Sequence, residues 1–214
     1  MTRIGRTEVE LIIPFYKRGS DLRSRANLDV VMQWWYLHGM DAKVLVGHSN
    51  ETPQLARDLY TQAVSRNPRA DVFVFASPDT LTPVQQIARA VKEVSPTDQI
   101  TKERRGYAIP FTRGRYLSDE TSRQVRDRTN DSSIFDVHEW WSLPPLHEDS
   151  IFSLPAASTR PPRSIESTVT VLSRAAVDAV LNGQGHLVHN PRLIEGPAVH
   201  LASSIFTTRQ PDNQ

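Results

Sequence analysis

The stretch VELIIPFY, residues 9–16, begins with a compact apolar run that predicts a buried β-strand ending at Pro14. After a polar loop, apolar residues recur at spacings of three and four from Asp21 onward, which predicts a helix that ends at Gly39. The next apolar run, AKVLVG at residues 42–47, predicts a second strand. Strand, helix and strand in this order predict a right-handed crossover between two parallel strands.

The same alternation continues along the chain. Residues 52–53, Thr-Pro, are typical of a helix start, and this helix is expected to end near Asn67. A third strand is predicted over residues 71–76, and TPVQ at residues 82–85 has the capping-box pattern at the start of a further helix. The predicted fold class is therefore α/β, Rossmann-like, with a mostly parallel sheet flanked by helices. Ligands of such sheets bind at the carboxyl ends of the strands.

Length and composition limit the class of protein. The chain has 214 residues, of which 38% are hydrophobic and 23% charged, so we expect one soluble globular domain over 1–214 with a disordered tail at 210–214. The sequence contains no cysteine, which excludes disulfides, thiolate metal sites and cysteine nucleophiles and favours the reducing cytoplasm. The first apolar run is too short for a signal peptide or a membrane span, so no membrane contact is expected.

The C-terminal half is less regular and carries opposed charges. Residues 102–128 contain eight basic and four acidic side chains, whereas residues 131–149 contain five acidic ones and no Lys or Arg. The formal net charge of +1 therefore hides a basic segment beside an acidic one. A proline-rich stretch at 143–162 predicts a long loop or lid. Regular structure is expected again at 167–172, a strand, and at 174–181, a helix with a glycine after its end.

Motifs of several common enzyme classes are absent from the sequence. It has no Gly-rich dinucleotide fingerprint, no Gly-Lys-Ser/Thr phosphate loop and no Gly-x-Ser-x-Gly elbow, which disfavours dehydrogenases and P-loop ATPases among others. The order and spacing of several segments instead resemble the GT-A class of nucleotide-sugar glycosyltransferases, particularly its family 2-like and galactosyltransferase-like branches. These segments are LIIPFY at 11–16, RANL at 25–28 and FVFASPD at 73–79, followed more loosely by 167–183 and LIE at 193–195.

The resemblance covers residues 8–95 and, less closely, residues 165–201, and it implies a single GT-A-like domain. Residues 8–95 would form the nucleotide-sugar-binding half and residues 96–209 the acceptor-side half. The implied activity is the transfer of a hexose or pentose from a nucleoside-diphosphate sugar, most simply a UDP-sugar, to an acceptor hydroxyl. The small size resembles that of compact glycosyltransferases of phages and bacteria, which makes phage DNA or a virion or cell-surface molecule the implied acceptor.

The resemblance also implies a divalent metal. In the family the third major strand ends in an Asp-x-Asp type motif, whose carboxylate holds the cation against the donor diphosphate, and hard oxygen ligands suit Mg²⁺ or Mn²⁺. Here the motif reads SPD at 77–79, so Asp79 is the expected ligand and Ser77 takes the place of the first acid. His200 resembles the late histidine ligand of some members. The alternatives are a turn residue for Asp79 and a core or surface histidine for His200.

The donor-binding residues are assigned by the same resemblance. Pro14, Phe15 and Tyr16 resemble the loop that receives the base and ribose of the donor. Arg18 and Arg25 are candidates for contact with its phosphates or base, with solvated charges at a helix start as the alternative.

A carboxylate is implied as the general base of an inverting enzyme, because a sugar hydroxyl is a poor nucleophile without one. Glu195 resembles the surviving acid of a Glu-Asp pair in which Gly196 replaces the second acid. Asp149 is the competing base, and Glu148 and Glu139 are further candidates in the acidic segment.

Aromatic and basic residues of the second half are candidates for the acceptor site. Trp140 and Trp141 can stack on a sugar, and core packing is their alternative. Arg113 belongs to the basic segment 102–128, where aromatic residues interleave with arginines. This pattern suits contact with nucleic-acid phosphates, with a donor diphosphate, or with solvent alone.

Other functions stay open at this level. A non-catalytic GT-A-like module that binds a nucleotide sugar or nucleic acid is favoured by the incomplete acidic motifs. A nucleotidyltransferase shares the strand–helix–strand layout and the metal dependence, but it normally has a Gly-rich first loop with Lys or Arg that this sequence lacks. His186, His189, Glu195 and His200 are chemically competent zinc ligands, although their spacing matches no known site rule.

Overall fold

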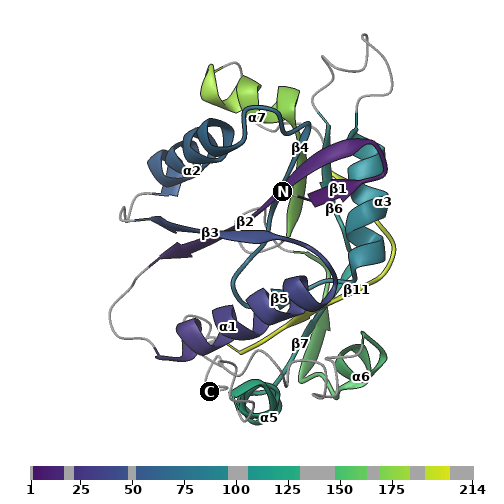
Figure 1. Ribbon diagram of the computed structural model, residues 1–214. Coiled ribbons are helices and arrows are strands. Elements are labelled where there is room, and N and C mark those ends of the chain that lie inside the picture. Colours follow the sequence, from purple (N-terminus) through teal and green to yellow (C-terminus); the bar gives the residue numbers. More distant parts are fainter. Residues whose placement is uncertain are drawn as a thin grey trace, which may run out of the picture.

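The computed structural model is an α/β fold in which helices cover a central sheet and a smaller sheet adjoins it (Figure 1). The α/β class predicted from the sequence is confirmed. The structure describes residues 2–16, 22–47, 52–95, 106–130, 148–162, 169–183 and 191–202.

Three parallel strands form the first part of the central sheet. β2 (Thr7–Tyr16) pairs with β3 (Ala42–Gly47) on one edge and with β4 (Val72–Phe75) on the other. The helix α1 (Leu22–Leu37) connects β2 to β3, and α2 (Thr52–Arg66) connects β3 to β4. The two helices lie on opposite sides of the sheet, as Figure 1 shows. All five elements were predicted from the sequence, the strands from short apolar runs, the first helix from apolar spacing and the second from the Thr-Pro start at residues 52–53.

The rest of the central sheet is mixed. β9 (Thr170–Ser173) lies antiparallel between β4 and β6 (Tyr107–Ile109), and β10 (Arg192–Leu193) pairs in parallel with β6. β1 (Thr2–Ile4) pairs antiparallel with the start of β2. The expectation of a mostly parallel sheet is therefore corrected, since half of the strand pairings are antiparallel. An apolar run predicts a buried strand but carries no information on its direction.

The second sheet consists of four short strands, in the order β5 (Thr80–Leu81), β11 (Pro197–His200), β7 (Arg113–Tyr116) and β8 (Ser158–Arg160). β7 follows β6 in the chain and β11 follows β10, so two neighbouring strands pass together from the central sheet into the second sheet. These strands of two to four residues are too short to show a period in the sequence, and the sequence did not predict them.

Part of the predicted proline-rich loop is regular structure, which corrects that prediction for residues 148–162. α5 (Asp119–Asn130) follows β7, and the short helix α6 (Glu148–Ser153) lies against β11. Phe152 of α6 contacts the ring of Trp34 edge to face, with centroids 5.8 Å apart. Prolines exclude a long helix but not a six-residue helix followed by an edge strand, β8, because an edge strand tolerates residues without an N–H.

Pro14 does not end the first strand as predicted, because β2 continues through it to Tyr16. The backbone of Ile12 faces β4, since its carbonyl accepts a hydrogen bond from the N–H of Ala76. Pro14 lies two residues further and faces the same edge, beyond the last residue of β4, Phe75. The missing N–H of Pro14 therefore removes no ladder hydrogen bond.

Several helix ends follow local chemistry, and the start of α3 does not. Gly39 and Gly183 have φ of +70° and +68° after α1 and α7 (Arg174–Leu181), the left-handed conformation that favours glycine. Ser173 caps α7 by accepting a hydrogen bond from the N–H of Ala176. The capping box predicted for α3 (Val84–Val94) is wrong, because Pro83 is the N-cap residue and no side chain caps this end.

The hydroxyl of Thr82 is buried and does not cap the start of α3. Its Oγ1 has no hydrogen-bond partner among the described residues. We expect Thr82→Val to leave the free energy of unfolding unchanged or to raise it by up to about 1 kcal/mol, because an unpaired hydroxyl is removed at constant shape. The matched change Thr80→Val should cost about 2 kcal/mol, because the Thr80 hydroxyl contacts both Asp79 and His200. Urea unfolding of both variants is the measurement, and a larger loss for Thr82→Val than for Thr80→Val would contradict this account.

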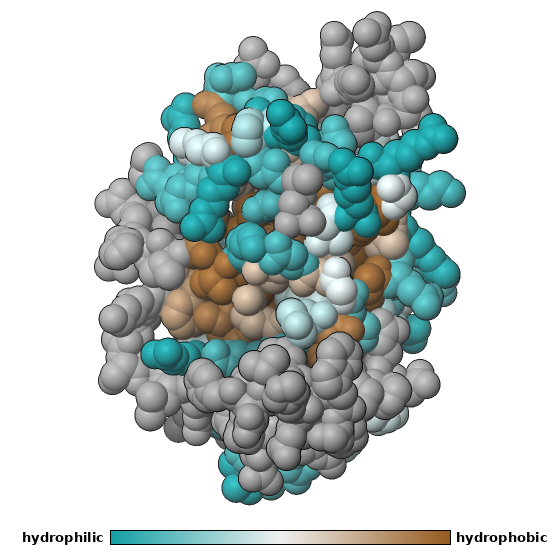
Figure 2. All heavy atoms as spheres, in the orientation of Figure 1, coloured by the Kyte–Doolittle hydropathy of each residue, from teal (hydrophilic) through white to brown (hydrophobic). Residues whose placement is uncertain are grey.

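The core lies between the central sheet and its helices. Trp34 and Trp35 of α1 are fully buried, together with Phe73 of β4 and Phe111 after β6. The Trp34 Nε1–H donates a hydrogen bond of 3.0 Å to the carbonyl of Thr82. Figure 2 shows hydrophobic side chains in the middle of one face, between the levels of β3 and α1, and hydrophilic ones toward α2 and α3. A tryptophan-to-alanine change in such a core typically costs about 3–5 kcal/mol.

The C-terminal end of the described chain is tied to two helices. Arg126 of α5 is buried and donates to Oδ1 of Asn27 in α1 at 2.9 Å, while the amide of Asn27 donates to the carbonyl of Ala202. The N–H of Ala202 donates to Oγ of Ser122. These bonds hold the residues after β11 against α1 and α5. Within the described ranges, no helix is long and apolar enough to cross a membrane.

Candidate functional site

The carboxyl ends of five strands meet at one edge of the central sheet. β2, β3 and β4 run parallel; β9 reverses the direction and β6 restores it, so β6 and β10 run in the same sense as β4. This edge, called the carboxyl edge below, therefore receives the end of β2 with Phe15, the turn after β4 with Asp79, and the turn after β10 with Glu195. The sequence placed all three segments at a nucleotide-sugar site, and the fold brings them to one edge.

Asp79 lies in the turn between β4 and β5. Its Oδ1 accepts a hydrogen bond from Oγ of Ser77 at 2.6 Å and another from Oγ1 of Thr80 at 3.1 Å. Its carbonyl accepts the N–H of Leu201 at 2.8 Å, which ties the turn to the end of β11. Among the described residues no hydrogen bond reaches Oδ2. The carboxylate is thus oriented by two hydroxyls through one oxygen, whereas its second oxygen accepts no hydrogen bond from the described part of the chain.

His200 lies on β11 opposite Thr80, and its Nδ1 is 2.9 Å from Oγ1 of Thr80. The side chain is 5% exposed. Its ring stacks on Tyr116 with centroids 4.3 Å apart and an angle of 10°, and it meets Phe111 edge to face. Burial lowers the pKa of His200 to about 4, and the negative charge of Asp79 opposes this shift only in part. The ring is therefore neutral at pH 7.

Gly114 provides the space for this ring. A Cβ at position 114 would lie 2.8 Å from Nε2 and 3.1 Å from Cδ2 of His200. Nε2 itself has no hydrogen-bond partner within the described part of the chain. In this geometry neither ring nitrogen is directed at Asp79, and ligation of a metal by His200 would require the ring to leave Thr80. Asp79 and His200 were predicted from the sequence for the same site, whereas Thr80, which lies between them, was not predicted.

Glu195 is exposed in the turn between β10 and β11. The turn is fixed by its backbone, because the carbonyl of Gly196 accepts hydrogen bonds from the N–H groups of Thr112 and Arg113 at 3.0 and 3.3 Å. Gln86 of α3 lies directly against Gly196, and with its amide oriented to donate it bonds the carbonyls of Pro110 and Pro197. The rigid backbone of this turn presents an exposed carboxylate at the carboxyl edge.

The remaining predicted site residues are placed less completely. Arg113 is exposed at the start of β7, paired with Pro197, and is therefore close to the turn that carries Glu195. Arg25 is exposed on the first half of α1. The backbones of Tyr16 and Asp149 belong to β2 and α6, whereas their side chains lie outside the described part. The predicted residues that lie entirely outside the described ranges are Arg18, Glu139, Trp140, Trp141, His186 and His189.

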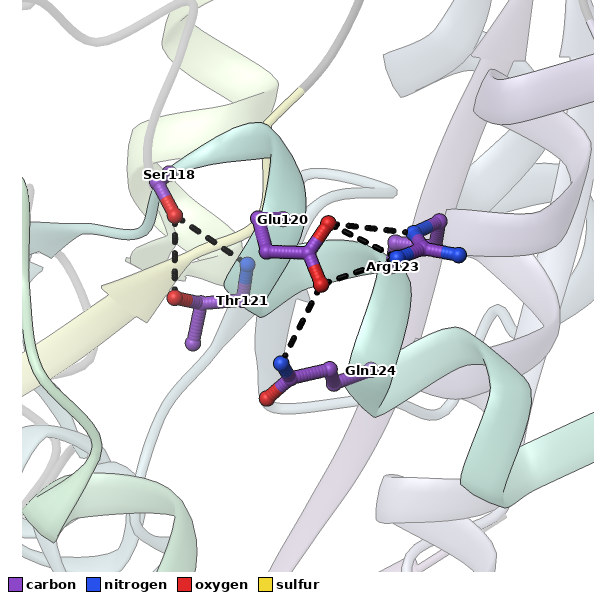
Figure 3. Close-up of polar contacts among 5 residues, drawn as sticks. All are labelled: Ser118, Glu120, Thr121, Arg123 and Gln124. Carbon is purple, nitrogen blue, oxygen red and sulfur yellow. Dashed lines mark hydrogen bonds and ion pairs between the residues drawn. The ribbon is translucent and has the colours of Figure 1, made fainter.

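Most described arginines of the basic segment are held by neighbouring groups. Arg115 donates to the carbonyl of Leu154 at 2.7 Å, and Arg126 is buried against α1. Arg123 forms an exposed bidentate pair with Glu120 in the first turns of α5 and lowers the pKa of that carboxyl (Figure 3). Ser118 caps the same helix by accepting the N–H of Thr121. Arg113 is the residue of this group whose side chain is exposed at the carboxyl edge.

Sequence reasoning missed Thr80, Gly114 and the stacking role of Tyr116. A hydroxyl residue directly after Asp79 is the local signal that would have marked Thr80 as its hydrogen-bond donor. No local signal marks Gly114, because its partner His200 is on a strand far along the chain.

No protein-family model matches the sequence, and the search of curated proteins finds no relative. Among solved structures, the chain is similar to a glycosyltransferase involved in the glycosylation of the major capsid of PBCV-1, with a TM-score of 0.40 and 11% identity. The alignment covers 92% of this chain and 95% of that one. A likeness of this size assigns neither an activity nor a residue.

Proposed function

We propose that the protein is a glycosyltransferase that moves a sugar from a nucleoside-diphosphate sugar to an acceptor hydroxyl with the help of Mg²⁺ or Mn²⁺. The observation that carries this proposal is the position of Asp79. Its carboxylate lies at the carboxyl edge, oriented by Ser77 and Thr80, beside the strand end that carries Phe15. A single oriented carboxylate at the carboxyl ends of parallel strands suits a donor diphosphate and its cation.

The donor set fits a cation shared with the substrate. The described residues contain no group of three or more His, Cys, Asp or Glu that could hold a metal ion. Magnesium is commonly held by one or two carboxylates together with substrate phosphates, so Asp79 through Oδ2 and the donor diphosphate would hold it jointly. When bound, the cation supplies positive charge against the leaving diphosphate. We therefore expect weak metal binding without a donor.

The other predicted residues divide between donor and acceptor. Pro14, Phe15 and Tyr16 would receive the base and ribose, preferably of a UDP-sugar, while Arg18 and Arg25 contact its phosphates. Ser77 keeps Asp79 in position. Trp140, Trp141 and Arg113 would hold the acceptor, which we propose to be phage DNA or a virion or cell-surface molecule.

The chemical step needs a base at the acceptor. Glu195 or Asp149 would take the proton of the acceptor hydroxyl while its oxygen bonds to the anomeric carbon, and the bond from that carbon to the diphosphate oxygen breaks. The exposure of Glu195 suits a base that must reach a bulky acceptor. The variants Glu195→Gln and Asp149→Asn distinguish the two candidates. The variant that lacks the base should lose sugar transfer but still bind the donor, whereas the other should keep both.

Asp79→Asn is the direct test of the proposal. Asparagine keeps an oxygen that accepts from Ser77 and Thr80, so the fold should be retained while the negative charge is lost. We expect cleavage of the donor with Mn²⁺ to fall by about 100-fold or more. Asp178→Asn is the control. Asp178 pairs with Arg174 on α7, and α7 follows the end of β9, which lies at the opposite edge of the sheet from Asp79.

The assay uses a panel of UDP-, GDP- and dTDP-sugars, with donor cleavage and thermal shift measured with and without Mn²⁺. Neither binding nor cleavage of any donor would overturn the proposal. Binding without cleavage would favour the non-catalytic nucleotide-sugar module. Release of pyrophosphate from a nucleoside triphosphate would favour the nucleotidyltransferase.

A further inference from the structure

The hydrogen-bond direction between Asp79, Thr80 and His200 follows from the chemistry of the three groups. The Thr80 hydroxyl has one hydrogen, and its Oγ1 lies 3.1 Å from Oδ1 of Asp79 and 2.9 Å from Nδ1 of His200. A carboxylate oxygen can only accept, so the hydroxyl hydrogen points to Asp79. Oγ1 must then accept from His200, which requires the hydrogen of the neutral ring to be on Nδ1.

The surroundings of the ring agree with this tautomer. Nε2 would be the bare acceptor, and it lies against Gly114, where no described group donates a hydrogen bond to it. The guanidinium of Arg160 also lies over the Tyr116 ring, 5.9 Å from the ring centroid.

The ring is also held rigidly enough to act as a support. It is stacked on Tyr116 of β7 and meets Phe111, and its own strand, β11, is hydrogen-bonded on both edges. A Thr80 hydrogen turned toward His200 would face the N–H of that ring and leave Asp79 without its donor. The rotamer of the Asp79 carboxylate is therefore fixed from the second sheet, and Oδ2 is kept clear of hydroxyl donors.

We propose that His200 is a positioning residue, which donates from Nδ1 to Thr80 and so commits the Thr80 hydrogen to Asp79, holding that carboxylate in the orientation that binds the donor's cation. The inference rests on the proposed function for its catalytic consequence. It differs from ligation by His200, because the ring acts here through Thr80.

The first experiment needs no donor. In uniformly folded protein at pH 7.5, with ¹⁵N-labelled histidine, the ring of His200 should show the hydrogen on Nδ1 and a bare Nε2. The His200→Asn variant identifies the signals of this ring by their loss. A hydrogen on Nε2 would overturn the proposal, whatever the outcome of the activity assays, because Thr80 could then not accept from the ring.

The second experiment uses variants that separate packing from donation. His200→Phe keeps a ring against Tyr116 but has no donor, whereas His200→Asn places an amide N–H near the position of Nδ1. We expect His200→Phe to raise the Mn²⁺ concentration for half-maximal donor cleavage by about tenfold or more, and His200→Asn to recover most of it. Thr80→Val should resemble His200→Phe, and Thr80→Ser the unchanged protein.

The pattern of these variants decides between the possible roles. Equal defects in His200→Phe and His200→Asn would overturn the positioning role, and so would a loss of kcat without a change in the metal requirement. If the unchanged protein cleaves no donor, the proposed function fails. In that case the ¹³C shift of the Asp79 carboxyl still tests the hydrogen-bond relay, since it should move in His200→Phe and return in His200→Asn.

Discussion

Replacing Gly196 with alanine is expected to lower the free energy of unfolding by about 3 kcal/mol, the sum of a backbone cost and a steric cost. Gly196 has φ of +144°, where residues with a Cβ are strained. A Cβ would also lie 2.5 Å from Cδ of Gln86, whose buried side chain is held between Pro110 and Pro197. Because this turn carries Glu195, donor cleavage should fall with stability.

Two controls separate the costs. Gly5→Ala introduces a Cβ at φ of +63° with no atom within 4 Å, so it should show the backbone cost alone, about 1 kcal/mol. The double variant Gly196→Ala, Gln86→Ala removes the clash and should recover part of the loss relative to Gln86→Ala alone. Urea unfolding provides all four values. A loss in Gly196→Ala no larger than that in Gly5→Ala would show that Gln86 does not fill this space.

The second large effect is a loss of stability in mild acid. The pKa of His200 is about 4 in the folded protein because of burial, below the ordinary value of 6.5 that applies to the unfolded chain. Between these values the unfolded chain binds a proton that the folded protein does not. Stability is therefore constant above about pH 7 and falls as the pH decreases, by about 2 kcal/mol at pH 5 and about 3 kcal/mol in full.

Urea unfolding at pH 7.5 and pH 5 measures this effect in a range where most carboxylates stay ionised. His200→Asn does not titrate, so its stability should change much less between the two pH values. The groups that contact the ring are Thr80, Tyr116 and Phe111. Asp79 lies behind Thr80, and Arg160 lies over Tyr116. A pH dependence that persists unchanged in His200→Asn would assign the effect to other histidines.

Elements with a clear period were predictable almost to the residue. β3 begins and ends where the run at 42–47 does. α7 occupies the predicted residues 174–181, because Ser173 caps its start and Gly183 follows its end. The strands of the second sheet were not predictable. β5 and β11 have two and four residues, and their pairing depends on a partner more than a hundred residues away.

The candidate site also contains residues that the sequence predicted and one that it did not. Asp79 and His200 were both assigned from the family resemblance, and the fold brings His200 of β11 next to Thr80, which bonds Asp79. The hydroxyl of Thr80 next to Asp79 is a local signal, but its contact with His200 depends on tertiary pairing that no local pattern encodes. The structure also explains why a glycine stands at 196, where the resemblance leads one to expect an acid. The backbone angle and Gln86 leave no room for a side chain there.

The pairing of β11 with β5 has a consequence for biosynthesis. Thr80 and His200 are 120 residues apart, so the Asp79 turn leaves the ribosome well before its supporting strand is made. At about 5–20 residues per second this delay is roughly 6–24 s. During that time β6 and β7 lack their partners β10 and β11, so the backbone N–H and C=O groups on these edges have no strand to pair with. The nascent chain should therefore depend on chaperones until its last described strand has joined the two sheets.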